Sequence, residues 1–305
     1  MDVKKVVFVG SKPLGAKVLD ALYTLAPQSL TGVVTYDDST DIRCALPQFR
    51  EFEKRTGKPL RVLKKSSELE LVMQELQPEL CIVVGWYWIL KPELLKSVSH
   101  GWLGIHASLL PKYRGGAPLV WAMINGESET GLSLFYFDEG MDTGDIVAQR
   151  RIKISSEDSI ADLLNRVEQE SVDVIQEMYP HLLAGTAPRM KQNHRQATYV
   201  SLRIPSDGHI DWNHPATRIY NFVRAQTHPY PGAFFYCKDR LIRLWSARPF
   251  EYPYFGAPGQ IVMVRGDSVV VTCGDGTGMS LLTIQPENGE EQNASQLLKF
   301  GQRLS

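Results

Sequence analysis

Short apolar segments alternate with helical patterns through the first third of the chain. Val6–Val9 is continuously apolar and ends at Gly10, after which apolar residues recur at helical spacing through Leu22. A buried strand that leads into a helix is a βα unit. Further strands are predicted at Val33–Thr35, Arg61–Leu63 and Cys81–Val84, and further helices at Phe49–Lys54 and Leu69–Leu76. Repeated βα units predict an α/β fold with a doubly wound, parallel-type sheet.

The pattern changes in the second half of the chain. A helical pattern from Ile160 to Leu183 closes the first domain, and a polar stretch then interrupts the periodicity. Beyond Ile204 come short β-rich segments divided by Gly-Asp turns, with one helical run from Thr217 to Arg224. We therefore expect a first domain at 1–184, a linker at 185–203 and a small antiparallel barrel at 204–305.

Composition excludes several classes of partner. The 33 Lys and Arg residues nearly balance the 34 Asp and Glu residues, so charge does not predict a nucleic-acid partner. No stretch approaches the roughly 20 apolar residues that span a bilayer, and Met1–Lys5 lacks a signal-peptide pattern. We expect a cytoplasmic protein without membrane contact or metal; a homo-oligomer is left open. The cysteines have neither zinc nor disulfide spacing: Cys44, Cys81, Cys237 and Cys273.

A histidine directly after an apolar strand is the most informative candidate for chemistry. It is His106, and some thirty residues later Asp142 follows in the Gly-rich acidic loop Asp138–Ile146. Transfer of an acyl group to an amine needs a base, a group that orients the base, and donors for the developing oxyanion. His106 and Asp142 can supply the first two. Taken alone, the histidine is more often structural, and the aspartate is an ordinary turn residue.

The two motifs together resemble the folate-dependent formyltransferases. A histidine that leads into SLLPKYRG, followed by a DxGxDTG loop, is typical of enzymes that use 10-formyltetrahydrofolate. Arg203–Trp212 and Pro229–Phe234 resemble the accessory domain of that family. The resemblance implies a Rossmann-like catalytic domain and a smaller OB-like C-terminal domain. It is nearest to sugar-nucleotide N-formyltransferases, such as the formyltransferase domain of the UDP-4-amino-4-deoxy-arabinose pathway enzyme. It therefore implies formyl transfer to the amine of a nucleotide-linked amino sugar, in lipopolysaccharide biosynthesis.

The resemblance also implies roles for single residues. His106 is the catalytic histidine, Asp142 tunes it, and Gly104 stands where the family has an asparagine that polarises the formyl oxygen. Folate is expected to contact Trp86, Tyr87, Trp88, Ile89, Leu90, Leu109, Leu110, Pro111, Asp138, Gly140 and Met141. The acceptor is expected to contact Gly10, Ser11, Lys12, Lys112, Tyr113 and Arg114. We expect both folate loops, 85–90 and 138–142, to emerge at the carboxyl edge of one parallel sheet.

Several of these assignments have structural alternatives. Aromatic runs such as Trp86–Trp88 usually pack in a core, and Gly10–Gly15 lacks the spacing of a P-loop. Lys112 and Arg114 also fit a solvated surface. Gly104 removes one oxyanion donor, which typically costs about 3 to 4 kcal/mol of transition-state stabilisation unless another donor replaces it.

Other acceptors follow from the same resemblance. Methionyl-tRNA formyltransferase shares both domains but needs a basic surface, and its basic Gly-rich insertion is replaced here by the short acidic stretch Tyr36–Asp41. Glycinamide ribonucleotide formyltransferase lacks the C-terminal domain. A hydroxyornithine-type amine, and a folate- or nucleotide-binding homologue without catalysis, are further alternatives. We expect a nucleotide-linked amino sugar as the small-molecule partner and no nucleic acid.

Overall fold

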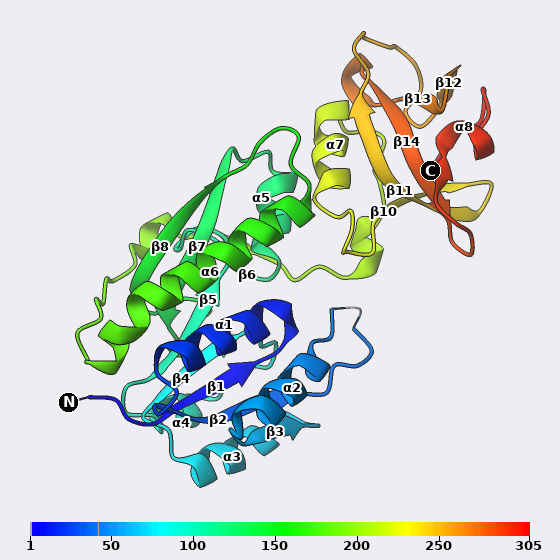
Figure 1. Cartoon of the computed structure of the whole chain (residues 1–305). Coiled ribbons are helices and arrows are strands. Elements are labelled where there is room, and N and C mark those ends of the chain that lie inside the picture. Colours follow the sequence, from blue (N-terminus) through cyan, green and yellow to red (C-terminus); the bar gives the residue numbers. More distant parts are fainter. Residues whose placement is uncertain (1, 42) are drawn as a thin grey trace. The chain divides into compact units, whose positions relative to one another are not determined.

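The structure, a computed structural model, describes residues 2–41 and 43–305 and divides into two compact units (Figure 1). The first unit consists of Met1–Gly115, Thr130–Ile152 and Asn165–Tyr199, and the second of Gly116–Glu129, Lys153–Leu164 and Val200–Ser305. Two segments from the middle of the chain thus fold with the C-terminal residues.

A seven-stranded sheet organises the first unit. The strands β1 to β5 run parallel to their neighbours, which confirms the predicted doubly wound α/β sheet. The strand β7 runs antiparallel to β5. Across the sheet the order is β3 (Leu60–Leu63), β2 (Leu30–Tyr36), β1 (Val6–Gly10), β4 (Leu80–Val84), β5 (Trp102–His106), β7 (Glu129–Tyr136) and β8 (Ile146–Lys153).

Alternate residues of the parallel strands face two separate hydrophobic cores. Val6 and Phe8 of β1 pack in one core with helices α1, α2 and α6, and Val7 and Val9 pack in the other with α3 and α4. Because both faces are covered, the central strands are continuously apolar in the sequence. The covering helices are α1 (Lys12–Leu25), α2 (Leu46–Thr56), α3 (Glu68–Leu76), α4 (Pro92–Lys96) and α6 (Ile160–Leu183).

Gly10 marks a close approach between the end of β1 and the neighbouring strand β4. A Cβ atom at Gly10 would lie 2.1 Å from the carbonyl oxygen of Val84. Backbone cannot move aside as a flexible side chain can, so only glycine fits here. The next residue, Ser11, donates a 2.6 Å hydrogen bond to the carbonyl oxygen of Gly85. The glycine at this sheet edge therefore has a structural reason, independent of any ligand.

An antiparallel sheet forms the core of the second unit, which confirms the predicted β-rich C-terminal domain. Its strands lie in the order β10 (Ala233–Cys237), β11 (Arg240–Pro249), β14 (Gly278–Pro286), β13 (Ser268–Thr272) and β12 (Ile261–Arg265), with β15 (Gln292–Asn293) beside β14. Its helices are α5 (Pro118–Ile124), α7 (Ala216–Arg224) and α8 (Ala294–Leu297), with the short turns η2 (Pro205–Gly208) and η3 (Gly274–Gly276).

The segment predicted as a linker contains ordered structure that belongs mostly to the first unit. Its η1 turn (His194–Gln196) is followed by β9 (Tyr199–Val200), which pairs with β6 (Arg114–Gly115). The backbone nitrogen of Arg114 donates to the carbonyl oxygen of Thr198 at 2.9 Å. This pairing brings residues near position 195 next to the loop that follows His106.

In the described ranges, no helix is long and apolar enough to cross a membrane. The same residues hold no cluster of His, Cys, Asp and Glu that could bind a metal ion. The four cysteines are free thiols, and burial raises the pKa of Cys273 to about 12.

Candidate active site

His106 is held by the backbone of the loop that follows it. Its Nε2 lies 2.7 Å from the carbonyl oxygen of Tyr113. Because a carbonyl oxygen can only accept, Nε2 must carry a proton, and in the neutral ring Nδ1 keeps its free lone pair. The histidine side chain is only 10% exposed. The structure therefore identifies Nδ1 as the basic atom of this residue.

Asp142 faces that basic nitrogen. Its Oδ2 lies 3.7 Å from His106 Nδ1 and accepts a 2.8 Å hydrogen bond from the backbone nitrogen of Gly115. The 3.7 Å separation suits an ion pair better than a hydrogen bond, so the carboxylate can stabilise an imidazolium once Nδ1 takes up a proton. Asp142 has a φ of 53°, in the left-handed region that few non-glycine residues adopt. The structure thus brings together the two residues that the sequence paired.

The acidic loop reaches His106 by a route that the sequence did not predict. In the antiparallel pair of β5 and β7, Ser133 lies opposite His106 and Tyr136 lies opposite Leu103. The strand β7 therefore ends toward the beginning of β5. The expectation that both folate loops leave the carboxyl edge of one parallel sheet is therefore wrong. The sequence could not show this, because a parallel strand and an antiparallel strand have the same apolar pattern. The loop instead folds back to the hydrogen bond at Gly115.

The aromatic rings of the loop after β4 divide into core and surface. Trp86 and Trp88 pack against Tyr36, with ring centroids 5.4 and 4.9 Å apart. Both indoles also pack against the core under α3 and α4. By contrast, Tyr87 and Ile89 are exposed, Ile89 to 94%. Both tryptophans thus have a packing role, while Tyr87 and Ile89 leave apolar surface on this loop, and folate contact stays a prediction for all of them.

The other predicted folate residues also differ in how far their side chains are exposed. Leu110 is buried, whereas Met141 in the acidic loop is 61% exposed. The Oδ1 of Asp138 accepts a hydrogen bond of 3.1 Å from the backbone nitrogen of Gly140, which stabilises the loop turn. Both predicted loops thus present an exposed apolar side chain, as a site for a flat ring requires. A role of these residues in folate binding stays a prediction.

The ring of Phe137 occupies the space beside Gly104. A Cβ atom at Gly104 would lie 2.2 Å from Phe137 Cε1 and 2.5 Å from its Cζ. A side chain at position 104 therefore fits only if this ring moves. The sequence showed the glycine at position 104 but not the aromatic ring that lies beside it. In the sequence Phe137 ends an apolar segment and is marked only as a packing residue.

Lys12 is neutralised by carboxylates of its own chain. Its Nζ forms an ion pair with Asp38 and lies 2.9 Å from Asp41 Oδ2. Burial by itself lowers the pKa of Lys12, but the hydrogen bonds to the two carboxylates outweigh it, and the pKa lies above its usual value. The ammonium is also near the rings of Tyr36 and Tyr87. A contact between Lys12 and an acceptor stays a prediction.

Arg114 lies inside the first unit and not on a substrate-facing surface. It is 1% exposed, and its guanidinium donates to Gln192 Oε1 from Nε at 3.2 Å and from Nη2 at 2.6 Å. Nη1 donates to the hydroxyl of Tyr199 at 2.9 Å, and Nη2 lies 3.1 Å from His194 Nδ1. These bonds correct both earlier interpretations of Arg114, as a phosphate ligand and as a solvated side chain. Lys112 is exposed.

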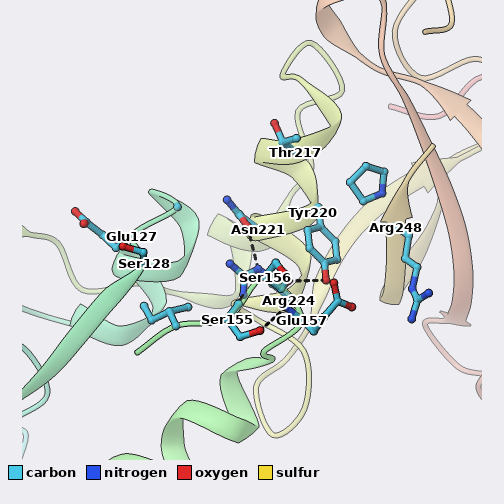
Figure 2. Close-up of a pocket in the computed structure, with 13 residues that line it drawn as sticks. Glu127, Ser128, Ser155, Ser156, Glu157, Thr217, Tyr220, Asn221, Arg224 and Arg248 are labelled. Carbon is cyan, nitrogen blue, oxygen red and sulfur yellow. Dashed lines mark hydrogen bonds between the residues drawn. The ribbon is translucent and has the colours of Figure 1, made fainter. Parts of the chain in front are cut away.

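The second unit contains a pocket of about 570 Å³ that no sequence motif predicted (Figure 2). Arg224 of α7 reaches into it and donates to the carbonyl oxygens of Ser155 at 2.9 Å and Asp158 at 2.8 Å. The hydroxyl of Tyr220 donates to the carbonyl oxygen of Ser156 at 2.9 Å. Burial, with the nearby Glu157 carboxylate, raises the pKa of Tyr220. These contacts fix the segment before α6.

Comparison with known sequences identifies the family. The profile described as Formyl transferase matches residues 4–179, and the one described as Formyl transferase, C-terminal domain, matches residues 204–301. The chain belongs to the formyl transferase family. One relative is the methionyl-tRNA formyltransferase of Caldanaerobacter subterraneus subsp. tengcongensis, 32% identical over 300 residues and aligned over 96% of both proteins. That of Acetivibrio thermocellus is 34% identical over 280 residues and aligned over 89% of both.

Solved structures of similar fold include a sugar formyl transferase and HypX. WlaRD, a sugar 3N-formyl transferase crystallised with dTDP and 5-N-formyl-THF, aligns with a TM-score of 0.66 at 16% identity, over 95% of this chain and 100% of that one. HypX from Aquifex aeolicus, in complex with tetrahydrofolic acid, aligns with a TM-score of 0.65 at 18% identity. This alignment covers 96% of the present chain and 46% of HypX, so the chain spans about half of HypX. At these identities the likeness shows the fold alone.

Membership of the formyl transferase family confirms two of the predictions made from the sequence. The chain is a folate-dependent formyltransferase, and 10-formyltetrahydrofolate is the co-substrate of this family. The acceptor of the formyl group is a separate question, because the relatives and the structural neighbours carry different acceptors in their names.

The Lys12 ion pairs predict a large difference between two lysines of α1. Replacing Lys12 with Met should lower the free energy of unfolding by about 3 to 5 kcal/mol, because Asp38 would stay buried without a counter-charge. The side chains of Lys12 and Asp38 are only 8% and 6% exposed. Lys17→Met is the control, since Lys17 is 57% exposed where it pairs with Glu168, and it should cost less than about 1 kcal/mol. Equal losses in urea unfolding would contradict the importance of the buried pair.

Proposed function

We propose that His106 accepts the proton of an attacking amine through Nδ1, and that Asp142 stabilises the imidazolium that results. The observation that carries this proposal is the pair of contacts at the histidine ring. Nε2 lies 2.7 Å from the Tyr113 carbonyl oxygen, and Nδ1 lies 3.7 Å from Asp142 Oδ2. The first contact determines which nitrogen is basic, and the second puts a negative charge beside it.

The proposed reaction is an acyl transfer through a tetrahedral intermediate. The amine nitrogen forms a bond to the formyl carbon, and its proton passes to His106 Nδ1. The bond between that carbon and N10 of the folate then breaks as His106 returns this proton to N10, which yields a formamide, tetrahydrofolate and the neutral histidine. Positioned bases of this kind typically contribute about a hundredfold to ten-thousandfold to the rate.

We place the folate between the loop of residues 85–90 and the loop of residues 138–142. Exposed apolar side chains on both loops support this assignment, Ile89 on the first and Met141 on the second. Asp142 belongs to the second loop and also faces His106. A folate bound against this loop would therefore bring its formyl group near the basic nitrogen.

The sequence relatives support methionyl-tRNA as the acceptor. The relatives named above are methionyl-tRNA formyltransferases, and they match this chain over 89% to 96% of its length. The sugar formyltransferase, in contrast, is similar at the level of the fold only. We therefore propose methionyl-tRNA first, ahead of the amino sugar to which the sequence motifs pointed.

A nucleotide-linked amino sugar is the second candidate, and the distribution of charge favours it. In the loop between β2 and α2, Asp38 and Asp41 neutralise the ammonium of Lys12 and add negative charge. Residues 204–305 carry equal numbers of basic and acidic side chains. Proteins that bind tRNA usually neutralise several phosphates with Lys and Arg, and these features provide no surplus of positive charge.

Replacing His106 with Ala should lower kcat by about a hundredfold or more, because the amine then loses its base. Folate affinity, measured by fluorescence titration, should change by less than about twofold, since the proposed task of the imidazole is proton transfer. His181→Ala is the matched control, because His181 is an exposed histidine on α6. A His106→Ala enzyme as fast as the His181 variant would exclude the proposed base.

The two acceptors can be compared directly in one assay. Methionyl-tRNA should be formylated at a higher kcat/KM than dTDP- or UDP-linked amino sugars, and this rate should fall steeply with salt because phosphate contacts release counterions. Formylation of an amino sugar together with an inert tRNA would reverse the order of the two candidates. Absence of transfer to either acceptor, with folate still bound, would indicate a binding protein instead.

The packing at Gly104 predicts that one substitution cannot restore the family asparagine. Gly104→Asn alone should destabilise the fold by about 1 to 3 kcal/mol, because its Cβ would meet the Phe137 ring. Combined with Phe137→Ala, the asparagine has room, and kcat should exceed that of the Phe137→Ala enzyme by about a hundredfold if its amide donates to the oxyanion. The comparison variant is Gly104→Ala with Phe137→Ala, which fills space without a donor. Equal kcat values for the two double variants would show that another donor already serves the oxyanion.

A further inference from the structure

We infer that Gln192 is a positioning residue that sets the distance between Asp142 and His106. This inference rests on the proposed function of the pair. Gln192 lies outside the motifs that mark the active site, in the polar segment that the sequence predicted as a linker. It is 6% exposed, and its carboxamide lies between the two loops that carry the reacting groups.

All hydrogen-bonding positions of the Gln192 carboxamide are used. Oε1 accepts from Arg114 twice, from Nε at 3.2 Å and from Nη2 at 2.6 Å. Nε2 donates twice, to the carbonyl oxygens of Asp142 at 2.8 Å and Gly144 at 2.7 Å. A guanidinium can only donate and the carbonyls can only accept, so the orientation of the amide is determined. Glutamine is suited to this position because one end must accept and the other must donate.

Arg114 links the same side chain to the histidine loop. Tyr113 and Gly115, the neighbours of Arg114 in the chain, contact His106 and Asp142 through their backbones. The carbonyl oxygen of Tyr113 accepts from His106, and the backbone nitrogen of Gly115 donates to Asp142. Gln192 therefore closes a ring of contacts that runs from Arg114 through the Asp142 backbone and back to Gly115. Within this ring the two loops cannot separate without breaking buried hydrogen bonds.

The backbone conformation of Asp142 needs stabilising contacts of this kind. Its φ of 53° is unfavourable for a residue with a side chain, so the surrounding contacts must hold it in place. The bonds from Gln192 to the carbonyl oxygens of Asp142 and Gly144 constrain the peptide that follows each of these two residues. Without them the turn can relax, and the carboxylate would move away from His106 Nδ1.

Gln192→Glu tests the inference because it is isosteric and keeps the acceptors for Arg114. It removes the two donors and places a negative charge against the carbonyl oxygens of Asp142 and Gly144. We expect kcat to fall by about tenfold to a hundredfold, as for a displacement of about 1 Å at a reacting group. The loss in kcat should exceed the change in KM for the formyl donor, because Gln192 contacts the loop that carries Asp142 and not the folate loop after β4.

Gln226→Glu is the matched control in the second unit. Gln226 is also buried, accepts from Arg203 Nη2 at 2.7 Å and donates to the carbonyl oxygen of Phe222 at 2.9 Å. Its replacement should lower the melting temperature by a similar amount and leave kcat unchanged. If both variants lose stability and neither loses kcat, Gln192 is only structural and the inference is overturned.

A double-mutant cycle with Asp142→Asn separates this inference from the proposed function. If Gln192 acts through the Asp142 carboxylate, Gln192→Glu should cost less than about threefold in kcat once Asp142 is Asn. Full additivity of the two losses would overturn the inference. An unchanged kcat for Asp142→Asn alone would instead overturn the proposed role of the pair, independently of Gln192.

Discussion

The buried contact between the Arg114 guanidinium and the Gln192 carboxamide holds the two halves of the active site in one arrangement. A buried guanidinium is costly unless its donors are bonded, and hydrogen bonds that involve a charged group contribute about 1.5 to 3 kcal/mol each. Arg114 meets this requirement with Gln192, Tyr199 and His194. The hydrogen bonds of the Arg114 guanidinium thus connect the loop after His106, the acidic loop and the segment near residue 195.

The same principle explains the edge of the sheet at Lys12. Here a second buried cation is paired with Asp38 and Asp41, and the loop between β2 and α2 is tied down by these contacts. The loop therefore offers an acceptor little free positive charge. The lack of free positive charge bears on the choice of acceptor. A tRNA has many phosphates that must be neutralised, whereas a nucleotide sugar has few.

The Phe137 ring occupies the space beside Gly104, where the family resemblance implies an asparagine. The ring of Phe137 and the side chain of an asparagine cannot share the space beside β5. An oxyanion that develops near His106 must then find its donors elsewhere, in backbone N–H groups or water.

The sequence by itself determined the fold class and indicated that His106 and Asp142 lie together. Continuous apolar strands that alternate with helical patterns indicate a largely parallel sheet covered on both faces, and the motifs around His106 and Asp142 are local in the chain. Only the tertiary structure decided the reversal of β7, the burial of Arg114, the Phe137 ring beside Gly104 and the place of Gln192. The physical reason is that strand direction and buried polar partners depend on contacts between residues far apart in the chain. Gln192 and Asp142, fifty positions apart, leave no periodic or local signal of their hydrogen bond.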